Sequence, residues 1–79
     1  MVKAYHFIIS EDYKRAIDCY DQVSQIDPKN INALNSKGNA YNVLKEYKKA
    51  IDCIDQTLQI DLKNINALFN KGLAYYNLE

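Results

Sequence analysis

The stretch that decides the fold is DPKNINAL at residues 27–34, which returns at residues 61–68 as DLKNINAL. The same shift of 34 positions superimposes YKRAIDC at residues 13–19 on YKKAIDC at residues 47–53. Roughly half of the overlapping positions are identical, far above chance, and a fixed period of this length is typical of proteins built from stacked supersecondary units.

Each unit contains two segments with helical periodicity. In the first segment of the second unit, Leu34, Gly38 and Tyr41 fall on one helix face at spacings of four and three. Asn30 and Asn64 are suitable N-caps for the segments that follow them. No segment combines period-two alternation with turn signals, so we expect no strands. The pattern predicts five helices joined as antiparallel hairpins, at residues 1–9, 12–26, 31–44, 47–61 and 65–78.

The composition excludes several classes of function. The 79 residues include 10 basic and 10 acidic residues, so the formal net charge is zero. A duplex-binding module normally carries a basic excess on one face, so we expect no nucleic-acid partner. No apolar run approaches the ~18 residues that cross a bilayer, and the first residues lack a convincing signal-peptide cleavage site. We therefore expect a soluble, cytoplasmic protein without a membrane partner.

The 34-residue period and its fixed positions resemble the tetratricopeptide repeat. In the second unit, the family's large, small, aromatic, small and large positions are held by Leu34, Gly38, Tyr41, Ala50 and Ile54. The resemblance covers essentially the whole chain. It implies an all-α fold in which antiparallel helical hairpins stack as a right-handed superhelix, an α-solenoid. Residues 1–79 would form one array: an N-terminally shortened first repeat at 1–30, a second at 31–64, and the first helix of a third at 65–79.

Three features depart from the family pattern. Glu11 and Lys45 stand where a glycine usually joins the two helices of a unit, and a left-handed turn is less comfortable without glycine. A lysine replaces the usual leucine of each first helix, at Lys3, Lys37 and Lys71. Leu62 replaces the proline that usually stops the second helix. This last change leaves open whether the helices on either side of Leu62 merge, which would invite domain swapping.

The resemblance implies that the first helix of each unit lines a concave groove for a peptide or a helix. Asparagine offers donors and acceptors to a peptide backbone, and apolar side chains add buried area. An ordinary solvated helix face is the alternative for the asparagine stripe on residues 31–44. The predicted peptide-binding residues are Asn35, Asn39, Asn42, Phe69, Asn70, Leu73 and Tyr76.

The function implied by the resemblance is a non-catalytic protein–protein interaction scaffold. Residues 65–78 are apolar nearly all round, so this helix needs cover on more than one face. That cover comes either from the next helix of a longer array, of which the chain is an excerpt, or from another copy of the chain. A self-associating structural fragment, a homo-oligomer, is therefore the alternative function. A more remote third is a regulatory appendage of an enzyme whose catalytic domain lies elsewhere.

Known members of the family grip the C-terminal carboxylate of chaperone tails with a clamp of polar and basic side chains. The clamp positions here hold Met1, Tyr5, Ser36, Asn66 and Asn70. None of them carries a positive charge, so a carboxylate would lack charge-assisted partners. We expect no binding of chaperone tails in this mode.

The sequence offers no chemistry of its own. Cys19 and Cys53 occupy equal positions in successive units, on the order of 10 Å apart and beyond the reach of a disulfide. Together with the single His6 they do not make a closed zinc site. The recurring carboxylates are expected on the solvated outer face, supported by Lys14 and Lys48; they are Asp18, Asp21, Asp52 and Asp55. We predict no catalytic residue, no metal site and no cofactor.

Overall fold

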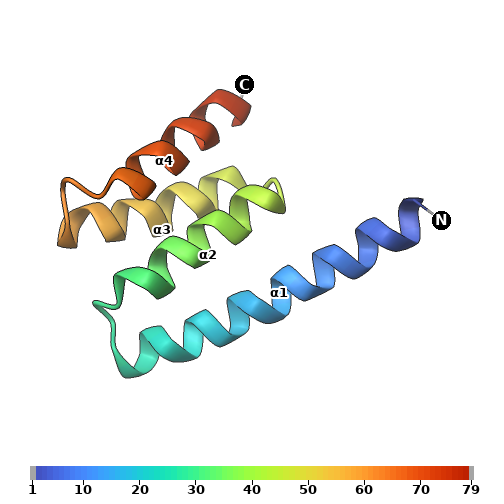
Figure 1. Cartoon of the computed structure of the whole chain (residues 1–79), viewed down its shortest axis with the longest axis horizontal. Coiled ribbons are helices and arrows are strands. Elements are labelled where there is room, and N and C mark those ends of the chain that lie inside the picture. Colours follow the sequence, from blue (N-terminus) through green and yellow to red (C-terminus); the bar gives the residue numbers. More distant parts are fainter. Residues whose placement is uncertain (1, 79) are drawn as a thin grey trace.

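The chain folds into four α-helices in a computed structural model that describes the backbone of residues 2–78 and the side chains of residues 10–78 (Figure 1). The helices are α1 (Val2–Ile26), α2 (Ile31–Val43), α3 (Tyr47–Ile60) and α4 (Ile65–Leu78). The described part contains no strand, and the body measures 42 × 32 × 16 Å. Each helix packs on its neighbour in chain order, and α2 also contacts α4. The predicted all-α class, a stack of antiparallel helices, is confirmed.

The same four-residue turn starts both α2 and α4. The amide of Asn30 donates to the carbonyl of Asp27, and the Asn30 side chain then accepts from the amide of Ala33 at 3.0 Å. One repeat later, Asn64 accepts from the amide of Ala67 at 2.9 Å. The asparagine satisfies an amide that the first helical turn leaves without a partner, so both predicted N-caps are confirmed.

α3 and α4 do not merge, although Leu62 stands where the family pattern has proline. Asp61 leaves the helical region with φ −138° and ψ 94°, and its carboxylate accepts from the amide of Lys63 at 3.2 Å. Its carbonyl accepts from the amide of Asn64, also at 3.2 Å. An aspartate that binds the backbone two residues on stabilises a turn without proline. Asp61 therefore ends α3 where the family pattern has Pro at the next position.

The α2–α3 hairpin depends on a strained turn and a close contact. Lys45 has φ 64°, a left-handed conformation that costs a non-glycine residue roughly 1–2 kcal/mol. The amide of Glu46 closes the turn by donating to the carbonyl of Tyr41 at 2.9 Å. A Cβ atom at Gly38 would lie 3.0 Å from Cγ1 of Ile54, so any larger residue there would require Ile54 to shift.

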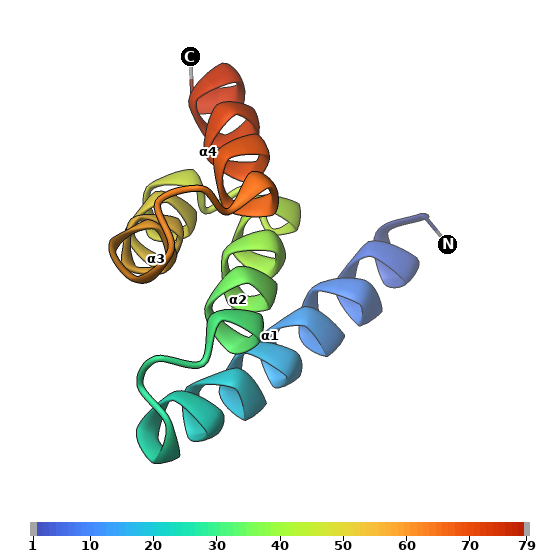
Figure 2. The same cartoon turned by 60° about the vertical axis from the view of Figure 1, so that its left-hand side comes forward.

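The first two predicted helices form one helix, so the predicted break between residues 9 and 12 is wrong. The backbone stays helical from Val2 to Ile26, and the first part of α1 runs on past the end of α2 (Figures 1 and 2). Glu11, at the position of Lys45, remains helical and pairs with Lys14 at 3.7 Å. Neither glycine nor proline interrupts this stretch, so nothing local opposes continued helical hydrogen bonding.

Two ion pairs join successive repeats through Asp21 and Asp55, two of the four recurring aspartates expected on the solvated outer face. The other two are exposed as expected; they are Asp18 and Asp52. Lys37 of α2 pairs with Asp21 of α1, and Lys71 of α4 pairs with Asp55 of α3 at 2.8 Å. Burial alone lowers the pKa of Lys37, but the hydrogen bond and charge of Asp21 outweigh it and raise that pKa. Lys37 and Lys71, which replace the family's leucine, thus join their repeats to the ones before them.

The two glycines should respond oppositely to alanine. We expect Gly72→Ala to stabilise the fold by up to about 1 kcal/mol, because no atom lies within 4 Å of the added Cβ and alanine is the better helix former. Gly38→Ala should destabilise it by about 1–2 kcal/mol, because overpacking against fully buried Ile54 exceeds that gain. Urea unfolding at low micromolar concentration measures both. Equal shifts would mean that Gly38 is not held at a close contact.

Candidate interaction surface

The asparagine stripe on α2 is only partly open to a ligand. Asn35 donates to the side-chain oxygen of Asn64 at 3.1 Å, and Asn42 donates to the backbone carbonyl of Asn70 at 3.1 Å. The side-chain oxygens of Asn35 and Asn42 are themselves buried, with no hydrogen-bond partner among residues 10–78. These side chains therefore join α2 to α4, whereas Asn39 lies exposed.

The apolar residues predicted on α4 are exposed. Phe69, Leu73 and Tyr76 are 67%, 40% and 83% exposed, and we call them the α4 stripe. The opposite side of α4 is buried through Ala67 and Ala74, which are fully inaccessible. Large apolar side chains gathered on one side of a helix mark an interaction surface more often than isolated ones do. The predicted residues thus divide into two helix-joining asparagines, half-buried Asn70, exposed Asn39 and the α4 stripe.

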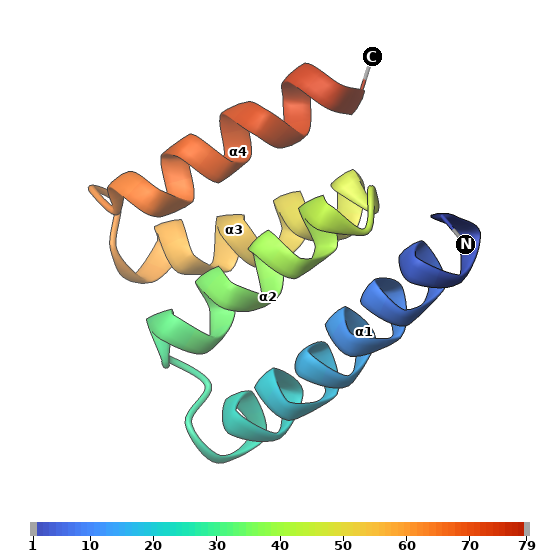
Figure 3. The same ribbon diagram turned by 45° about the vertical axis from the view of Figure 1, so that its right-hand side comes forward.

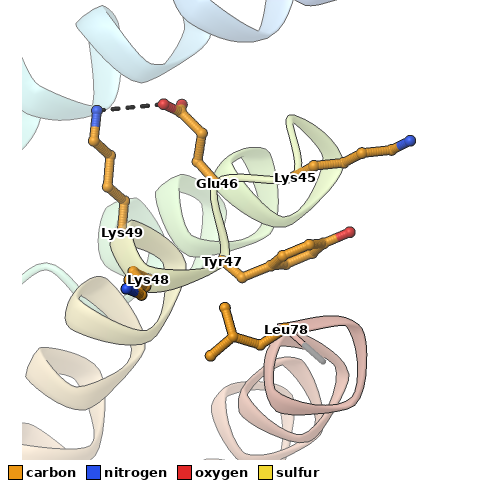
Figure 4. Close-up of a pocket in the computed structure, with 6 residues that line it drawn as sticks. All are labelled: Lys45, Glu46, Tyr47, Lys48, Lys49 and Leu78. Carbon is orange, nitrogen blue, oxygen red and sulfur yellow. Dashed lines mark hydrogen bonds and ion pairs between the residues drawn. The ribbon is translucent and has the colours of Figure 1, made fainter.

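One hollow lies elsewhere, at the α2–α3 turn, with a volume of ≈ 330 Å³ (Figure 4). Leu78 reaches from the end of α4 toward Tyr47, while Lys45 and Lys49 extend away from the hollow. Lys49 instead pairs with Glu46 at 3.3 Å. Because Lys45 and Lys49 point in different directions, their two ammonium groups do not converge on one anion.

The clamp positions remain without a basic side chain where the structure describes them. Ser36 and Asn70 are half-buried, and Asn66 is exposed. Met1 lies outside the described residues, and so does the side chain of Tyr5. Sequence reasoning missed the role of Asn64, which caps α4 and also accepts from Asn35. Its N-cap position was visible in the sequence, but its second hydrogen bond depends on how the two repeats stack.

The two cysteines, equal in sequence position, differ in environment. Both are free thiols, but Cys19 is exposed and Cys53 is buried. Burial raises the pKa of Cys53 by disfavouring the thiolate, and the charge of Lys37 opposes this in part. Within the part of the chain that is described, no three metal-ligating side chains gather at one place.

Models of known protein families match the chain. A family model described as tetratricopeptide repeat matches residues 31–64, and one described as TPR repeat matches residues 4–45. The chain belongs to the tetratricopeptide repeat family. A search among curated proteins finds no match. Members of the family generally act as protein-interaction scaffolds and are typically non-catalytic. Across residues 2–78, no helix combines the length and apolar character needed to cross a membrane.

The environments of the thiols give a direct test of the fold in solution. At low micromolar concentration we expect a thiol reagent to modify Cys19 at least about tenfold faster than Cys53, because burial both shields Cys53 and raises its pKa. Mass spectrometry of partly alkylated protein assigns the two rates. Equal rates in native buffer would mean that the α2–α3 hairpin opens faster than the reagent reacts.

Proposed function

We propose that this chain binds a peptide or a short helix along the α4 stripe and Asn39 of α2, and that it catalyses no reaction. The observation that carries the proposal is the exposure of Phe69 and Tyr76 on a helix whose opposite side is buried through Ala67 and Ala74. Burying such side chains on binding contributes about 25 cal/mol per Å² of apolar surface removed from water.

The chemistry of the surface sets the kind of partner. The α4 stripe offers apolar area without charge, and Asn39 adds an amide that can donate to or accept from a peptide backbone. An amphipathic segment with apolar residues at helical spacing fits such a surface. Because the described clamp positions lack a basic side chain, a free carboxylate on the partner contributes little.

The proposal predicts that loss of the apolar anchors weakens binding. A peptide selected by display against the full chain should bind at least about tenfold more weakly to Leu73→Ala or Phe69→Ala in a fluorescence titration. Ile26→Ala is the matched control, because Ile26 is 86% exposed at the far end of α1. Affinity that stays within twofold in both stripe variants would rule out the α4 stripe as the binding surface.

The peptide's own terminus supplies a second prediction. Amidating its C-terminal carboxylate should leave the affinity unchanged, since the described clamp positions Ser36, Asn66 and Asn70 carry no positive charge. The same titration with free and amidated peptide measures this. A large loss on amidation would mean that a carboxylate site exists elsewhere on the chain.

A further inference from the structure

One face of α1 lacks the cover that its counterpart on α3 has. We call this face the α1 slot; it consists of Ala16, Tyr20 and Val23. The residues 34 positions later on α3 are all fully buried; they are Ala50, Ile54 and Thr57. In contrast, Ala16 and Tyr20 are only half-buried and Val23 is 38% exposed. A hollow of ≈ 280 Å³ lies beside Tyr20 and Val23, between α1 and the start of α2.

One face of α4 is exposed, although the matching face of α2 is packed against α3. We call it the α4 open face; it consists of Leu68, Gly72 and Tyr75. The residues 34 positions earlier on α2 are Leu34, which is buried, Gly38, which lies against Ile54 of α3, and Tyr41, which packs against the cluster of Ala50 and Ile54. Leu34 is 4% exposed, whereas Leu68 is 50% exposed and Tyr75 is 52% exposed. No atom lies within 4 Å of a Cβ placed on Gly72, so this glycine meets nothing in the isolated chain.

The two faces match each other because the chain already contains their packed form. The α1 slot corresponds in the repeat to the face of α3 that meets α2, and the α4 open face corresponds to the face of α2 that carries Gly38, the residue in close contact with Ile54 of α3. We infer that α4 of one copy of this chain packs antiparallel on the α1 slot of a second copy, as α2 packs on α3.

The chain's own first residues carry alanine where α4 carries glycine. In the repeat register, Ala4 stands where Gly38 and Gly72 stand. In the packed α2–α3 hairpin a Cβ at Gly38 would meet Ile54 at 3.0 Å, so glycine suits this position better than alanine. The backbone of residues 2–9 instead continues α1 away from α2 (Figure 2). Gly72 on α4 carries no such obstruction.

The inferred contact also repeats a pair of cation–π contacts that exists within the chain. Tyr41 lies between two ammonium groups, with Lys37 at 5.9 Å and Lys49 at 5.8 Å from the ring centroid. In the inferred contact, Tyr75 takes the place of Tyr41, and the register sets Lys71 of the same copy and Arg15 of the second copy beside it. Two cations on one tyrosine ring contribute favourably, and more so once water is excluded.

The contact joins different surfaces, so it does not close on itself. The α1 slot and the α4 open face belong to helices at opposite ends of the stack (Figure 3). An interface between unlike patches generates open chains or rings, whereas a two-fold contact stops at the dimer. The helix order of one copy, α1 to α4, then continues into α1 of the next as one repeat array.

The test uses the full chain and two variants, each blocked at one surface. Gly72→Leu fills the α4 open face without burying a charge, and Ala16→Glu places a charge in the half-buried α1 slot. Light scattering over a wide concentration range should show the unmodified chain growing past the dimer. Each variant alone should remain monomeric, with association weakened at least about tenfold. An equal mixture of the two should stop at the dimer, because one open surface of each kind remains. Far-ultraviolet circular dichroism checks that both variants stay helical.

Other outcomes overturn the inference. If the mass of the unmodified chain stops at the dimer, the contact is two-fold and not the inferred one. If the mixture of variants stays monomeric, these two faces do not bind each other. A monomer at every concentration with Cys19 already protected would mean that residues 2–9 fold back into the slot. If the inference holds, alkylation of Cys19 slows as the protein concentration rises, because its counterpart Cys53 is buried in the packed hairpin.

The same variants separate self-assembly from peptide binding. Leu73 occupies the position of exposed Asn39, so Leu73→Ala should leave the mass distribution unchanged. Gly72→Leu should abolish growth and leave the affinity for a selected peptide within about twofold. If Leu73→Ala lowers both assembly and peptide affinity, the two surfaces are one and the inferred packing is overturned.

Discussion

The close approach of α2 to α3 at Gly38 is the contact on which the rest of the fold depends. It brings the helices together where Ala50 and Ile54 become fully buried. Ala67 of α4 then packs into the same cluster, so the position of the third repeat is set by the interior of the second. The packing that follows offsets the left-handed Lys45 turn, which costs roughly 1–2 kcal/mol and which no isolated helix would adopt.

The first repeat shows what happens when that contact is weakened. Closing a hairpin at Glu11 would require the same left-handed turn and would break helical hydrogen bonds on both sides of it. A hairpin would bury the first helix against the second. Ala4 stands there at the position where the second repeat has Gly38, so the close approach that favours this burial is less available. A continuous helix avoids the turn altogether and leaves Ala16 and Tyr20 half-buried. The second repeat therefore forms a hairpin at Lys45, where the close packing at Gly38 is available, and the first repeat keeps a continuous helix at Glu11.

Local signals in the sequence predicted the parts of the fold that local interactions fix. The Asn30 and Asn64 caps and the helical periodicity gave three helices within a residue of their ends. The continuity of α1 could not be predicted in this way, because it rests on comparing two packed states of the same segment. The Lys37–Asp21 pair was missed for a related reason: its partners lie on different repeats, and only the stacking geometry brings them together. In the same way, periodicity put Asn35 and Asn42 on a shared face but did not reveal that α4 would cover it.

The change from asparagine to aromatic residues between the second and third repeats connects the two proposed surfaces of α4. Asn35 and Asn42 meet the following helix through amide hydrogen bonds, and Phe69 and Tyr76 hold the same positions one repeat later. A helix that follows α4 would meet apolar area there instead of amides. Leu73, at the position of exposed Asn39, points away from that contact. In the inferred assembly the second copy's α2 takes the place of that following helix and meets Phe69 and Tyr76. Of the α4 stripe, only the side that carries Leu73 then stays open to a peptide, so assembly and peptide binding compete for the rest of the stripe.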